Sequence, residues 1–142
     1  MEVVRHKDYK ELLAYLPHVK SSLKEWMFVD VRITDFSDKD LTVENAAQAV
    51  QALFRLREGK LYICNDREIL LIVRWGKNNP PSAIADSVSK ALPEKGCVVF
   101  VHEPTAAGLA KLEILITYKK PVVAPTLSDV RATRRENVIL VA

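Results

Sequence analysis

The chain has 142 residues, of which 49% are hydrophobic and 27% are charged, and its formal net charge is +3 at pH 7. This balance is typical of one α+β domain with an adequate core and excludes a largely disordered or low-complexity chain. No apolar stretch reaches the roughly 18–20 residues that span a bilayer, and the scattered basic residues argue against a nucleic-acid-binding face.

The first half of the chain shows helical, then strand-like, then helical patterning. The predicted elements are a helix over 7–26, a strand over 27–33, an acidic loop over 34–40 and a helix that ends near residue 57. We expect Pro17 to kink or split the first helix, because proline lacks the backbone donor and clashes one turn back. Asp40 or Thr42 can cap the second helix.

Two strand-like runs follow, separated by Asn65 and Asp66, a pair that favours the turn of a β-hairpin. The predicted elements of this half are strands over 60–64 and 67–75, a helix over 82–92, a strand over 97–102 and a segment over 106–118. The last segment is predicted as a helix, although its end has the composition of a strand as well. Residues 119–136, which include two prolines, are typical of a linker.

This order predicts a domain over 1–118 in which a helical segment precedes a core over 27–118. The core order β-α-β-β-α-β is that of a ferredoxin-like antiparallel sheet with helices on one face. Right-handed crossovers place strands 27–33 and 67–75 near its centre. The unbroken apolar run over 69–73 indicates a strand with both faces covered. The N-terminal helical segment or the last helix would cover the second face, or else a partner chain would, as a homodimer.

The chain ends in an apolar strand over 137–142. A basic lead-in followed by Asn137-Val138-Ile139-Leu140-Val141-Ala142 resembles the opening strand of a response-regulator receiver domain. We therefore expect this strand to begin a following domain. The alternative is a strand that returns to the sheet of the same domain.

Over about residues 26–118 the chain resembles a degenerate GGDEF domain, the fold of diguanylate cyclases. Where that family carries its Gly-Gly-Asp-Glu-Phe turn, this chain has Asn65-Asp66-Arg67-Glu68-Ile69, followed by an apolar strand. The family's metal-binding aspartate at the end of the first strand corresponds to Asp30. The resemblance therefore implies a ligand site formed by Asp30, Asn65, Asp66 and Glu68.

The departures from the family's pattern argue against catalysis. The paired glycines that let a nucleotide approach the backbone are replaced by side chains. Arg67 stands where an acid is needed to hold Mg²⁺ against phosphates, and only Glu68 of the motif is retained. We expect no enzyme activity, no cofactor and no metal site.

The sequence thus favours a non-catalytic regulatory or interaction domain of a bacterial-type signalling protein, placed before a receiver domain and contacting a signalling partner. One alternative is a sensor that binds a nucleotide or small ligand in the degenerate cyclase pocket. A second is an RNA-binding, RRM-like module, although the central strands lack the aromatic residues such modules stack on bases. Cys64 and Cys97 lie in separate apolar runs, which predicts reduced thiols in a cytoplasmic protein without membrane contact.

Overall fold

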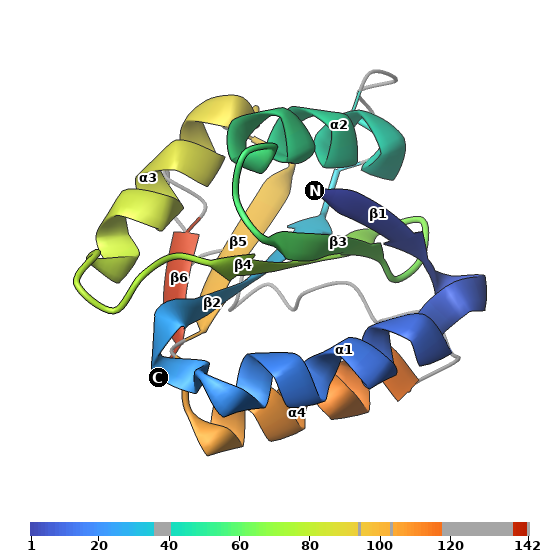
Figure 1. The fold of residues 1–142 in the computed structure, drawn as a ribbon. Helices are drawn as coiled ribbons and strands as arrows, with labels where there is room; N and C mark the ends of the chain where they lie inside the picture. The colour runs from blue at the N-terminus through green and yellow to red at the C-terminus, as the bar shows by residue number, and fades with distance from the viewer. Residues whose placement is uncertain (36–40, 94, 103, 118–137, 142) are drawn as a thin grey trace.

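The computed structural model describes residues 1–35, 41–93, 95–102, 104–117 and 138–141. Within these ranges the fold is α+β, with an open mixed sheet between two layers of helices (Figure 1). The strands are β1 (Glu2–Arg5), β2 (Trp26–Ile33), β3 (Gly59–Ile63), β4 (Glu68–Arg74), β5 (Cys97–His102) and β6 (Val138–Val141). The α-helices are α1 (Tyr9–Ser21), α2 (Val43–Phe54), α3 (Pro81–Ala91) and α4 (Ala106–Thr117).

The strand order is β1-β3-β4-β2-β5-β6, and β2 and β4 lie side by side at the centre as expected. The four inner strands pair antiparallel, whereas β1 pairs in parallel with β3 and β6 in parallel with β5. The four strands of the predicted core therefore pair antiparallel as expected, and the parallel edge strands β1 and β6, which lie outside that core, make the whole sheet mixed. β1 escaped prediction because a strand of four residues is too short to show periodicity beside a helix.

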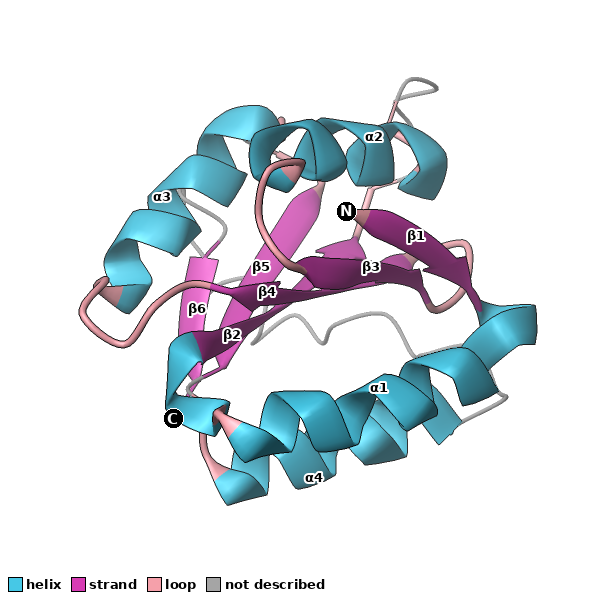
Figure 2. Ribbon diagram, viewed as in Figure 1, coloured by secondary structure: helices cyan, strands magenta, loops and turns pink. Residues whose placement is uncertain are grey.

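Helices cover both faces of the sheet (Figure 2), and the second face is covered by the N-terminal helix and the last helix, the elements expected to cover it. A first core packs α2 and α3 against the sheet, through residues such as Val50 and Ile84. A second core packs α1 and α4 against the opposite face, through residues such as Leu12 and Leu112. Every residue of the run over 69–73 is buried, so the chain itself covers both faces of β4, as its composition required. The homodimer stays a prediction that rests on other surfaces.

The N-terminal helix is shorter than predicted and is not split at Pro17. α1 continues through Pro17 to Ser21, and single 3₁₀ turns flank it at His6–Asp8 and Leu23–Glu25. Pro17 is exposed, so its ring lies on the solvent side of the helix, and the missing donor costs one hydrogen bond without ending the helix. At the other end of the domain, α4 is a helix throughout 106–117, so the strand-like composition of its last turn does not make it a strand.

The last strand, β6, lies beside β5, with Val138 opposite Val99. This pairing is the one expected if the C-terminal strand returns to the sheet of the same domain. A domain that follows this strand stays a prediction. The predicted linker falls mostly outside the described residues. Among the helices that the structure describes, none is long and apolar enough to cross a bilayer.

Candidate functional site

Strand alternation decides which face of the sheet the candidate acids occupy. Met27, Val29 and Val31 of β2 belong to the first core, whereas Trp26 and Phe28 belong to the second. Successive side chains of a strand point to opposite faces. Asp30 and Arg32 therefore project toward the α1–α4 layer. Glu68, directly opposite Arg32 on β4, projects to the same face.

Asp30, Arg32 and Glu68 form one polar cluster, which we call the acid–arginine cluster. Arg32 donates from Nε and Nη2 to Asp30 Oδ2, at 3.3 and 3.2 Å, and from Nε to Glu68 Oε2 at 3.2 Å. Both acids are buried, with 2% of Asp30 and none of Glu68 exposed. The guanidinium thus takes one oxygen of each carboxyl group and supplies the positive charge between them.

The other oxygen of each carboxyl group, Asp30 Oδ1 and Glu68 Oε1, is buried without a hydrogen-bond partner among the described residues. Burial raises the pKa of Asp30 well above its usual value, and the neighbouring carboxyl group of Glu68 raises it further, against the opposing effect of Arg32. A carboxyl group in such surroundings favours its protonated form.

Neighbouring strands complete the surroundings of the cluster. Arg32 lies over the ring of Phe100, with 4.5 Å between the guanidinium carbon and the ring centroid. Cys64, the residue after β3, donates its backbone N–H to the backbone carbonyl of Glu68 at 3.0 Å, and its side chain belongs to the second core. Burial, followed by the charges of Glu68 and Asp30, raises the pKa of Cys64 well above its usual value. The cluster is therefore a closed, charge-coupled part of the second core.

The structure separates the four predicted ligand residues into two groups. Asp30 and Glu68 lie on adjacent strands and share Arg32, as described above. Asn65 and Asp66 lie in the turn between β3 and β4, where Asn65 Oδ1 accepts a hydrogen bond from Arg67 N–H at 2.8 Å and Asp66 is exposed. Asn65 thus closes the hairpin turn, as asparagine often does.

Sequence reasoning missed Arg32, the residue that joins the two acids. A signal for it was present, because Asp30 and Arg32 are two residues apart in a strand and must share a face. Both acids are enclosed. Among the described residues, no group of three or more His, Cys, Asp or Glu side chains is arranged to hold a metal ion.

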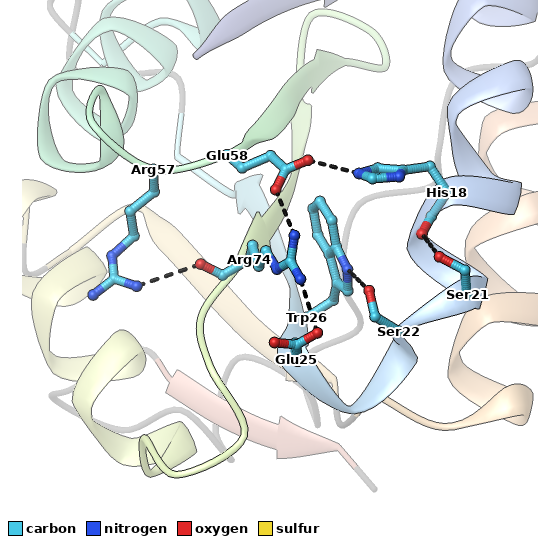
Figure 3. A network of polar contacts seen from close by, with 8 residues as sticks. All are labelled: His18, Ser21, Ser22, Glu25, Trp26, Arg57, Glu58 and Arg74. Carbon is cyan, nitrogen blue, oxygen red and sulfur yellow. Dashed lines mark hydrogen bonds and ion pairs between the residues drawn. The ribbon is translucent and has the colours of Figure 1, made fainter.

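A second polar network lies on the surface at the opposite end of β2 (Figure 3). Glu58 binds His18 of α1 through Oε1 at 2.6 Å and Arg74 of β4 through Oε2 at 2.9 Å. Arg74 also reaches Glu25, at 2.9 Å. Arg57 donates to the backbone carbonyl of Arg74 and lies 4.2 Å from the ring centroid of Trp75.

This network connects α1 to the β3–β4 hairpin through hydrogen bonds and ion pairs. Its ionic side chains are between 37% and 48% exposed, so water screens their attraction. Hydrogen bonds from Arg74 first, and then from His18, lower the pKa of Glu58. An ionised Glu58 with both oxygens occupied stabilises the junction of the two layers and is poorly placed to act as a base.

No family model, curated protein or solved structure matches this chain.

Proposed function

We propose that this chain is a non-catalytic regulatory and interaction domain of a bacterial-type signalling protein. The observation that carries the proposal is the position of Arg32, which binds Oδ2 of Asp30 and Oε2 of Glu68. Metal-dependent nucleotidyl transfer needs such carboxylate oxygens for Mg²⁺. A fixed guanidinium between them serves packing and charge balance instead.

The proposed mode of action is contact through the outer surface of the helical layers. Leu53, Leu56 and Ile114 are the exposed large apolar side chains of the described residues, and Leu56 is 92% exposed. These side chains on and after α2 and on α4 offer apolar contacts to a signalling partner or to a second copy. In the full protein, such contact would bias a following receiver domain through the linker, in a cytoplasmic setting compatible with the two free thiols.

We also propose that β2, β3, β4 and β5 with α2 and α3 form a ferredoxin-like unit, to which β1, α1, α4 and β6 are added. This is supported by the antiparallel pairing of the four inner strands and by the presence of both crossover helices in one core. The added helices argue against the RRM-like alternative, because base stacking on a sheet needs an open face.

A nucleotide or small-ligand sensor is the second candidate. The observation that favours it is the pair of buried carboxyl oxygens, Asp30 Oδ1 and Glu68 Oε1, that lack a donor. A ligand with suitable donors would satisfy them, whereas a proton satisfies them without a ligand.

A thermal melt combined with light scattering separates the two candidates. We expect the melting temperature of the chain to be unchanged by GTP or cyclic di-GMP with Mg²⁺, since neither gains a contact in the folded state. A dimer seen by light scattering would identify a second copy as one partner. A rise of several degrees with nucleotide, lost in Glu68→Gln, would overturn the proposal in favour of the sensor, because a ligand that binds only the folded state raises its stability.

A further inference from the structure

The starting point is how the hydrogen-bond donors of Arg32 are distributed. Its contacts go to Asp30 Oδ2 and Glu68 Oε2. They leave Asp30 Oδ1 and Glu68 Oε1 buried and without a donor among the described residues. Two acceptors enclosed on adjacent strands would each carry the full cost of lost hydration.

One proton removes this difficulty. We propose that Asp30 and Glu68 hold a single proton between Oδ1 and Oε1 in the folded state, and that this shared proton makes the stability of the domain sensitive to pH. One carboxyl group then donates to the other, so both orphaned oxygens gain a partner. Together with Arg32, the protonated pair carries no net charge, whereas two ionised acids would leave one uncompensated negative charge in the second core.

The other titratable groups on this face do not supply the missing charge. Burial, followed by the charges of Lys111 on α4 and of Arg32, lowers the pKa of His102 on β5, which favours its neutral form. Tyr62 on β3 and Cys64, the residue after this strand, are buried with raised pKa values, so both are protonated and neutral. His6, in the turn before α1, interacts with Tyr62 through its ring nitrogen at 2.7 Å. Within the part of the chain that the structure describes, Arg32 is therefore the cation in direct contact with the acids.

The sign of the pH dependence follows from proton counting. The pKa of Asp30 is raised on folding, by burial first and by Glu68 second. Between the unfolded and folded pKa values, the folded state binds more protons than the unfolded chain. The stabilising effect is thus present in full below the unfolded value and is lost as pH rises through the folded value. For one proton, the folding equilibrium constant falls about tenfold per pH unit in this window.

The test compares wild type with Asp30→Asn, whose amide keeps an acceptor for Arg32 and offers a permanent donor to Glu68. Urea unfolding is measured from pH 5 to pH 9. We expect the wild-type folding constant, relative to that of the variant, to fall with rising pH. Folding lowers the pKa of His102, so this residue makes both proteins more stable as the pH rises toward its unfolded pKa. The comparison between the two proteins cancels this shared effect. Asp86→Asn, at an exposed position of α3, is the matched control and should keep the wild-type slope.

Infrared spectroscopy of the wild type supplies a second readout that needs no variant to fold. A carbonyl band of a protonated carboxylic acid at neutral pH, lost on unfolding, is the expected result. Its absence, or equal pH slopes for wild type and Asp30→Asn, would overturn the proposal and leave both acids ionised. If Asp30→Asn does not fold, Glu68→Gln takes its place and the infrared band decides.

Discussion

Arg32 is the residue on which the second core most depends for charge balance. Its side chain is 27% exposed, whereas the two acids it binds are almost fully enclosed. Removing one partner of a buried ion pair is costly, because the remaining charges lose their compensation. The cluster therefore stabilises the fold only when all three of its residues are present, and no single contact accounts for its contribution to stability.

Replacing Arg32 by methionine keeps the length of the side chain and removes its charge. We expect Arg32→Met to lower the free energy of unfolding by about 3 kcal/mol. The loss should grow with pH, since deprotonating either acid then leaves a buried charge without its cation. Urea denaturation at two pH values measures both effects.

The control for this change is Arg5→Met, which breaks the exposed pair that Arg5 forms with Glu44. We expect a far smaller loss there, with little change between the two pH values, because solvent screens surface pairs. Similar losses in the two variants would contradict the special role of Arg32.

The thiols of the two cysteines have raised pKa values, so their ionisation is suppressed. Burial raises the pKa of Cys97 to about 11, and burial with the nearby acids raises that of Cys64 well above its usual value. The thiolate is the reactive form, so neither thiol should react in the folded protein.

We therefore expect a disulfide reagent to label the chain only after unfolding, when both of its 2 cysteines become reactive. Absorbance of the released thiol, followed in native buffer and in urea, measures this. The variants Cys64→Ala and Cys97→Ala assign any residual native reaction to one site. Fast labelling of Cys64 in native buffer would mean that the α1–α4 layer opens readily.

At the scale of elements, α1 tolerates a proline in its interior. Pro17 cannot donate a hydrogen bond to the carbonyl four residues earlier, that of Leu13, yet the helix continues for one more turn. Packing of Leu12, Leu16 and Val19 in the second core compensates for the lost bond, since all three are buried.

Pro17→Ala should accordingly stabilise the domain. The helix gains a donor worth up to about 3 kcal/mol in propensity, and the unfolded chain gains freedom that offsets about 1 kcal/mol of it. We expect a net gain of about 1–2 kcal/mol in chemical denaturation. Lys20→Ala, at an exposed position of the same helix, is the control and should change little. If the free energy of unfolding of Pro17→Ala equals that of the wild type, the hydrogen bond missing at Pro17 does not destabilise the helix.

At the scale of the whole molecule, one sheet lies between the two larger cores of the described residues, and these two cores share no helix. Each core contains one tryptophan, Trp75 in the first and Trp26 in the second. Because β2 and β4 contribute side chains to both cores, loss of either helical layer should expose one apolar face of the strands on which the remaining layer packs. We expect the two layers to unfold together.

The variants Trp26→Phe and Trp75→Phe each leave a single fluorescent reporter of one core. In both, we expect the fluorescence change in urea to coincide with the loss of helical circular dichroism, as in a two-state transition. A fluorescence transition of Trp26 that precedes the loss of helix would instead show that the α1–α4 layer detaches first.

The sequence by itself determined the local features of this protein. Helical periodicity located α2 and α3, the turn residues located the β3–β4 hairpin, and the apolar run over 69–73 showed that both faces of β4 are covered. These features depend on residues close together in the chain, and so they leave a readable pattern.

Only the tertiary structure decided which helices cover the second face and which charges meet inside it. Arg32 and Glu68 are 36 positions apart, and their contact depends on the register between β2 and β4. A slip of one residue would turn Glu68 to the other face. No local pattern encodes that register, and the same is true of the parallel edge pairing of β1. The acid–arginine cluster thus arises from packing between distant segments, which is why its residues looked like an open ligand site in the sequence and form a closed cluster in the fold.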